Sequence, residues 1–369
     1  MTDTRLLALI PSLPKVVLHE HLDGGLRPAS MLELAEAAGH TLPVTDDAAA
    51  LGDWFFDAAN SGSLPTYLET FDHTIACMQT ADALARVAKE AVLDNAADGV
   101  VYTEQRWAPE QHVTAGLSLE AALEAVQAGL EQGMAEAASN GHTIVAKQII
   151  TAMRHADRWQ DLANLAVAYR DIIAGFDIAG AEAGFMPDRH PDIWPYLASN
   201  DVPVTIHAGE AAGVDSIAQA VHLGQAERIG HGVRIIDDIA TSRDVGASVA
   251  RLGRTAAWVR DHQIALEVAP VSNLQTGASP ATTIADHPIT RLKELDFAVT
   301  LNTDNRLMSR TSMTNEMRLL VDQAGWTIDD LLDVTVTAAW SAFIHHDERL
   351  ALVENVIYPG FEKAEGAVL

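Results

Sequence analysis

Two histidines stand one residue apart at the end of an apolar run, in the segment V-V-L-H-E-H-L-D-G-G of residues 16–25. Alternate residues of a β-strand point to the same face, so His19 and His21 would project side by side. Because the 369 residues include 15 histidines, chance alone predicts roughly 0.6 His-x-His triplets in the chain. The pair is therefore informative only through its position at the end of a predicted strand.

Polar clusters of the same kind follow three later apolar runs. The segment T-I-H-A-G-E contains His207 and Glu210, I-G-H-G contains His231, and L-N-T-D-N contains Asp304 and Asn305. A lone histidine at the end of a strand is more often structural than functional. Four clusters at the ends of four different strands instead indicate one shared site.

Three imidazoles and one carboxylate form a mixed nitrogen and oxygen donor set, which suits Zn²⁺ and leaves one position open for water. The candidate ligands of one zinc ion per chain are His19, His21, His207 and Asp304. Iron is an alternative metal for the same set. Glu210 and His231 are then available to transfer protons.

Eight apolar or β-branched runs alternate with helical patterns along the chain. The runs are residues 15–19, 99–106, 143–150, 172–179, 202–208, 228–232, 264–269 and 297–304. Residues 118–131 have apolar positions at helical spacing, and Thr327 with Asp330 forms a capping-box pattern. Eight alternating units predict a (β/α)₈ TIM barrel, whose active site lies where the polar clusters fall, at the carboxyl ends of the strands.

The interval between the first two predicted strands is too long for one crossover helix. It spans approximately residues 24–98 and contains several helical patterns. We expect a single barrel domain over residues 1–369, with this helical insertion lying over the barrel mouth as a lid or pocket wall. An insertion that covers another part of the barrel is the alternative.

The net charge of −27 disfavours nucleic acid, anionic membranes and strongly anionic substrates as partners, because the summed field repels them. No apolar run approaches the length of a membrane span. The single cysteine, Cys77, excludes an internal disulfide, so a reducing, cytoplasmic setting is the default expectation. A small neutral substrate fits this composition, and the oligomeric state is left open.

The polar clusters, taken in order, resemble those of the adenosine deaminase family. The motifs are H-x-H-L-D-G at 19–24, H-A-G-E at 207–210, G-H-G at 230–232 and N-T-D-N at 302–305. The segments M-R-H at 153–155, D-I-A-G-A-E at 177–182 and E-V-A-P-V-S-N at 267–273 extend the similarity over nearly the whole chain. The resemblance implies a zinc hydrolase of purine salvage that converts adenosine and 2′-deoxyadenosine to the inosines and ammonia.

The resemblance also implies a role for each matching residue. Zinc would be held by His19, His21, His207 and Asp304. Glu210 would donate a proton to the purine, while His231 would orient the attacking water and help to deprotonate it. The residues expected to contact the nucleoside are His21 and Asp23 at the ribose, the backbone of Gly180 at the purine, and an apolar wall of Leu64, Tyr67 and Leu68 beside the sugar. The spacing of that wall is equally typical of a plain helix core.

Two positions depart from the family pattern. Many members have an aspartate next to the metal-binding one, where this chain has Asn305. An amide can still donate a hydrogen bond to purine N7. Ala181 replaces an acidic residue that is often found in the glycine-containing loop.

Three other functions remain open from the sequence. A sister deaminase acting on adenine or aminodeoxyfutalosine would share the metal ligands. An AMP deaminase needs cations for the phosphate, and only Arg27 lies beside the first motif. The alternative from a different class is an inactive barrel that serves as a binding protein, which the complete ligand set and Glu210 argue against.

Overall fold

The strands form a closed barrel. The computed structural model describes residues 4–242 and 249–366, and the barrel strands within them are β1 (Lys15–His21), β2 (Val100–Trp107), β3 (Val145–Met153), β4 (Ile173–Ala179), β5 (Thr205–Ala208), β6 (Arg228–His231), β9 (Ala265–Val268) and β10 (Val299–Leu301). They pair in parallel in the orders β1-β2-β3-β4 and β5-β6-β9-β10. The bridges Glu20–Asp304 and Phe176–Val204 join the two halves. All eight predicted runs are confirmed as strands of a (β/α)₈ barrel.

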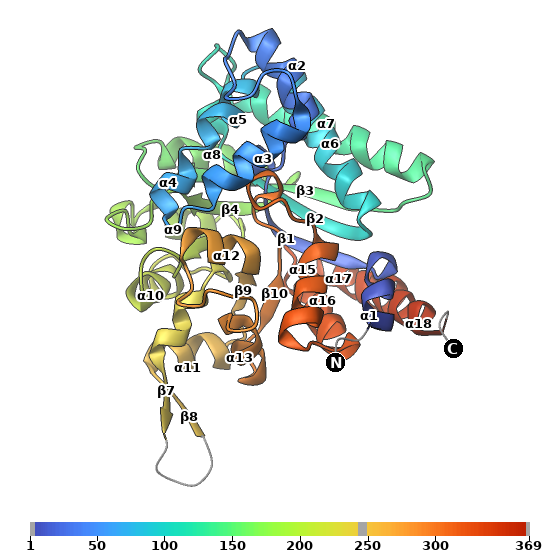
Figure 1. Cartoon of the computed structure of the whole chain (residues 1–369). Coiled ribbons are helices and arrows are strands. Elements are labelled where there is room, and N and C mark those ends of the chain that lie inside the picture. The colour runs from blue at the N-terminus through green and yellow to red at the C-terminus, as the bar shows by residue number, and fades with distance from the viewer. Residues whose placement is uncertain (1–3, 243–248, 367–369) are drawn as a thin grey trace.

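Helices surround this barrel (Figure 1). Those that follow β2 are α7 (Leu119–Ser139), α8 (Trp159–Ala168), α9 (Ile193–Ala198), α10 (Val214–His222), α11 (Arg254–Asp261), α12 (Pro270–Thr276), α13 (Pro288–Glu294), α14 (Arg306–Ser309), α15 (Met313–Ala324), α16 (Ile328–Ser341), α17 (His346–Leu352) and α18 (Tyr358–Gly366). The predicted capping box begins α16: Thr327 accepts from the backbone of Asp330, whose carboxylate accepts from the backbone of Thr327. At the other end of the chain, α1 (Thr4–Leu9) packs against α15.

The insertion after β1 is helical, as the sequence indicates. Its helices are α2 (Pro28–Ala38), α3 (Ala48–Ala59), α4 (Leu64–Leu68) and α5 (Phe71–Cys77), followed by α6 (Ala81–Ala97). α3 packs against α14 and α4 against α12, so both lie over segments that follow the carboxyl ends of β10 and β9. α6 packs against α7 and β2 in the manner of a crossover helix and belongs to the barrel wall. A lid role for α2–α5 stays a prediction.

A β-hairpin between β6 and α11 was not predicted from the sequence. An antiparallel hairpin of β7 (Ile239–Ser242) and β8 (Val249–Leu252) follows β6 and projects away from the barrel (Figure 1). Among the described residues, no helix combines the length and apolar character needed to cross a bilayer.

Candidate active site

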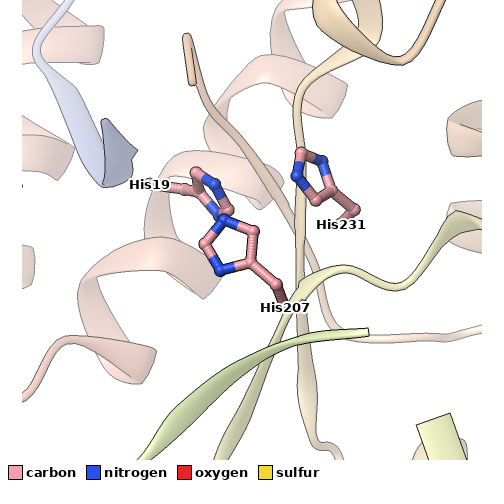
Figure 2. Close-up of side chains that lie close together, drawn as sticks. All are labelled: His19, His207 and His231. Carbon is pink, nitrogen blue, oxygen red and sulfur yellow. The ribbon is translucent and has the colours of Figure 1, made fainter. Parts of the chain in front are cut away.

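Histidine rings from three strands meet at the carboxyl end of the barrel. Figure 2 shows His19 from β1, His207 from β5 and His231 from β6 gathered at one place. The centroid of His19 lies 4.6 Å from that of His207 and 4.7 Å from that of His231. A fourth ring, that of His21, lies 5.1 Å from His207. The polar clusters predicted to share one site are therefore neighbours.

The four predicted metal ligands direct their free donor atoms toward a common point. The Nε2 atoms of His21 and His207 are 3.1 Å apart, and the Nε2 atoms of His19 and His21 each lie 3.4 Å from Oδ1 of Asp304. Nε2 of His19 is buried and has no hydrogen-bond partner. Lone pairs crowded together in a buried space fit a metal cation, which would satisfy all four atoms at once. His231 also lies near two members of this set: ring nitrogens of His19, His207 and His231 lie within 4.8 Å of one another, close enough to share a metal ion.

Two buried carboxylates orient the imidazoles from behind. Nδ1 of His19 lies 2.9 Å from Glu267, and Nδ1 of His207 lies 2.9 Å from Asp177. Each ring therefore donates through Nδ1 and presents the lone pair of Nε2 to the site. No role for Asp177 or Glu267 was predicted from the sequence, although both residues belong to motifs that extend the resemblance.

A buried arginine holds both supporting carboxylates in their charged form. Arg106 donates to Asp177 at 2.8 Å and to Glu267 at 2.7 Å, and all three side chains are fully buried. Burial alone would raise the pKa of Asp177, but His207 and Arg106 outweigh it and lower that pKa to about 2. Burial would likewise raise the pKa of Glu267, but the cations Arg106 and Arg228 outweigh it and lower that pKa well below its usual value.

Asp304 is fixed by a backbone bridge and by one serine. Its N–H donates to the carbonyl of His19 at 3.0 Å, and its carbonyl accepts from the N–H of His21 at 2.8 Å. Ser272 donates to Oδ2 at 2.5 Å, which leaves Oδ1 facing the imidazoles. Asp304 has φ +57° and His231 has φ +60°, in the left-handed region that costs a non-glycine residue about 1–3 kcal/mol. The surrounding contacts hold this strained backbone at the site.

Glu210 and His231 form a second pair beside the ligands. Oε2 of Glu210 lies 3.6 Å from Nε2 of His231, whose Nδ1 is 2.9 Å from the side-chain amide nitrogen of Asn273. Burial raises the pKa of Glu210 well above its usual value, assisted by the negative charges of Asp304 and Glu182. Burial also lowers the pKa of His231 well below its usual value. These shifts favour the protonated form of the Glu210 carboxyl and the neutral form of the His231 imidazole.

The predicted ribose residue Asp23 lies beside His21 and has an unused acceptor. Its Oδ1 is buried without a hydrogen-bond partner, 3.9 Å from Nδ1 of His21. Its Oδ2 lies 3.5 Å from Nε2 of His112, a buried residue that the sequence analysis did not select. Asp23 can therefore accept a hydrogen bond from a ligand hydroxyl.

The predicted purine contacts lie on two loops of the same end. Gly180 directly follows β4 with φ +95°, a conformation that favours glycine. Asn305 follows Asp304, is 3% exposed, and has no hydrogen-bond partner for Oδ1. A Cβ added at Gly24 would lie 1.9 Å from that oxygen, so the close approach of the two loops requires glycine.

The three residues of the predicted apolar wall lie on α4. Tyr67 is buried, its hydroxyl has no hydrogen-bond partner, and burial together with Asp304 raises its pKa well above the usual value. Tyr67 is thus a neighbour of Asp304. Leu64 is buried and Leu68 half-buried, and α4 as a whole packs against α12. Their contact with a sugar stays a prediction.

Comparison with known proteins gives one consistent relationship. The family model described as adenosine deaminase matches residues 14–359. Adenosine deaminase 1 of Streptomyces coelicolor is 55% identical over 350 residues, covering 94% of this chain and 87% of that protein. The adenosine deaminase of Mycolicibacterium vanbaalenii is 52% identical over 349 residues, covering 94% of this chain and 95% of that protein.

Solved structures with lower identity share the fold. A zinc-bound amidohydrolase from Burkholderia ambifaria superposes with a TM-score of 0.82 at 24% identity, covering 100% of this chain and 96% of that chain. An adenine deaminase from Arthrobacter aurescens gives a TM-score of 0.79 at 21% identity, covering 96% and 99% of the two chains. Both likenesses agree with the barrel described above.

Proposed function

The chain belongs to the adenosine deaminase family, and from this premise we propose that the site described above performs the hydrolysis of adenosine and 2′-deoxyadenosine to the inosines and ammonia. The chain is accordingly a hydrolytic enzyme that acts on a small purine. One observation carries the assignment of the site: the Nε2 atoms of His19, His21 and His207 gather with Oδ1 of Asp304 beside the buried pair of Glu210 and His231.

The donor set suits one zinc ion per chain. His19, His21, His207 and Asp304 would hold it, because their free atoms converge while Glu267, Asp177 and Ser272 engage the opposite sides of three of them. Zinc, when bound, supplies a Lewis acid that lowers the pKa of a coordinated water toward neutrality. The proposal of zinc rests on this chemistry and on the mixed set of imidazole and carboxylate ligands.

Glu210 supplies the proton that purine chemistry needs. C6 of adenine is a poor electrophile, and a proton donated to N1 withdraws electron density from it. Burial raises the pKa of the Glu210 carboxyl and so favours the protonated form, which gives its proton to N1 as water adds to C6. One proton of the water passes by way of His231 to the amino nitrogen, which leaves as ammonia when its bond to C6 breaks. The second proton of the water, left on the C6 oxygen, returns to Glu210 as the C6 carbonyl forms.

Burial lowers the pKa of His231 well below its usual value and so favours the neutral imidazole. Its Nδ1 lies 2.9 Å from the side-chain amide of Asn273 and its Nε2 3.6 Å from Glu210; for Nε2 to accept a proton, Nδ1–H must donate to the amide oxygen of Asn273. From there it orients the attacking water and assists its deprotonation. The nucleoside is held by Asp23 and His21 at the ribose.

Adenosine is favoured over the alternative substrates. The curated relatives at 50–55% identity that cover nearly the whole chain are adenosine deaminases, whereas the likeness to an adenine deaminase is restricted to fold at 21% identity. An absorbance assay with adenosine, 2′-deoxyadenosine, adenine and AMP, after metal analysis of the same sample, tests this. Turnover of adenine or AMP without turnover of the nucleosides would overturn the assignment.

Asn305 is expected to read purine N7. Its side chain is 3% exposed, and its amide NH₂ would donate a hydrogen bond to that ring atom. Asn305→Ala should lower kcat/KM for adenosine by a factor that corresponds to about 1–3 kcal/mol. This is the cost of leaving purine N7 buried without a donor. With 7-deazaadenosine, which lacks the acceptor, the same substitution should change kcat/KM very little. Additive losses in this cycle of residue and ring atom would mean that Asn305 does not contact N7.

A further inference from the structure

Glu182 places a buried carboxylate against four consecutive backbone N–H groups. Its Oε1 accepts from the N–H of Gly209 at 2.7 Å. Its Oε2 accepts from the N–H groups of Glu210, Ala211 and Ala212 at 3.1, 2.6 and 2.7 Å. Glu182 is 2% exposed and lies in the loop after β4, so one side chain from that loop holds the whole segment that follows β5.

The N–H groups of this segment are paired by Glu182 and not by a strand ladder. Gly209 has φ +70° and turns the chain sharply after β5, and the following N–H groups face the carboxylate of Glu182. The hydrogen bonds from Gly209 and Glu210 are buried, where an unpaired N–H group costs about 1–3 kcal/mol, and the two oxygens of Glu182 serve all four groups. A glutamine offers one oxygen and introduces an NH₂ donor that would oppose a backbone N–H.

A cation balances the charge of Glu182. Arg154 is fully buried, donates to the carbonyls of His207 and Phe185, and interacts electrostatically with Glu182. The same arginine thus ties the end of β5 to the loop that carries Glu182. Together these two side chains pair backbone groups on both sides of Glu210, from the carbonyl of His207 to the N–H of Ala212.

We propose that Glu182 is a positioning residue for the general acid: it fixes the loop from which Glu210 reaches the purine. The inference rests on the proposed function, because it requires Glu210 to be the proton donor. Glu182 touches neither the metal ligands' donor atoms nor, in this scheme, the substrate. Besides its charge, which helps to raise the pKa of Glu210, Glu182 acts through the backbone of residues 209–212, where a displacement of about 1 Å of a reacting group can cost 10²-fold in rate.

Kinetics of Glu182→Gln test the inference. We expect kcat for adenosine to fall about 10- to 100-fold while KM changes less than about 3-fold, because positioning of the acid affects the chemical step more than binding. Bound metal per chain and thermal stability are measured on the same sample. Glu110→Gln is the matched control, since Glu110 also accepts a backbone N–H, that of Met153 at 2.7 Å, at the end of another strand.

A double-mutant cycle separates positioning from general structural support. If Glu182 acts through Glu210, adding Glu182→Gln to Glu210→Gln should reduce the residual rate by less than about 2-fold. A full multiplicative loss in the double variant would overturn the inference, as would a kcat of Glu182→Gln within 2-fold of the parent. If Glu182→Gln does not fold, Glu182→Asp, which keeps both acceptor oxygens, replaces it in the same cycle.

The two proposals fail in different ways. A severe loss in Glu210→Gln with normal kcat in Glu182→Gln overturns the positioning role alone. Normal kcat in Glu210→Gln overturns the proposed acid and, with it, the role of Glu182.

Discussion

Glu210→Gln is expected to lower kcat for adenosine by about 10²–10⁴-fold, the range that general acid catalysis contributes. The substitution keeps the shape of the side chain and removes the only proton that this group can give. Glu210 is 6% exposed, so water has little access to replace it as a donor. KM and the metal content should change little, because Glu210 is not among the proposed ligands.

The pH profile provides an independent check on the same variant. Burial, Asp304 and Glu182 raise the pKa of Glu210, against smaller opposing effects of Thr276 and Arg154. Since the acid acts in its protonated form, the parent enzyme should lose activity as pH rises through that pKa. Glu210→Gln should lack this loss. A variant with near-normal kcat and unchanged metal content would exclude Glu210 as the acid.

Asp304→Ala should have a comparably large effect by a different route. It removes the one proposed carboxylate ligand and leaves Ser272 without its acceptor. A Lewis acid lowers the activation free energy of such reactions by several kcal/mol, and each 1.36 kcal/mol of activation free energy changes the rate about tenfold. We therefore expect kcat/KM to fall by about 10³-fold or more, with loss of tightly bound metal.

A surface carboxylate serves as the control for Asp304→Ala. Asp237 pairs with Arg234 in an exposed ion pair, and Asp237→Asn should leave both metal content and rate unchanged. Full metal content in Asp304→Ala would contradict the proposed ligand set.

The barrel and the cluster at its end could be predicted from the sequence because both follow from local patterns. The apolar run predicted at residues 172–179 forms β4, which is buried along its full length, as a strand covered on both faces should be. His19, His207 and Asp304 could be grouped because parallel strands end at one edge of the barrel. That inference needs no knowledge of side-chain contacts.

The supporting contacts could not be predicted in the same way, because they join residues far apart in the sequence. Glu267 meets His19 across 248 positions, and its place in the apolar run of β9 gave no sign of a partner. The contact of Glu182 with residues 209–212 depends on the turn at Gly209, which the pattern of residues does not specify. The β7–β8 hairpin was missed because its segment lacks the apolar run of a barrel strand.

The central claim is that the imidazole and carboxylate cluster binds the metal on which adenosine hydrolysis depends. The most direct measurement is a titration of metal-stripped protein with Zn²⁺, followed by the absorbance change as adenosine becomes inosine. The account predicts no turnover without metal and a rate that rises linearly to a plateau at one zinc per chain. Full activity in protein shown to contain no metal, or no turnover in protein carrying one zinc per chain, would contradict it.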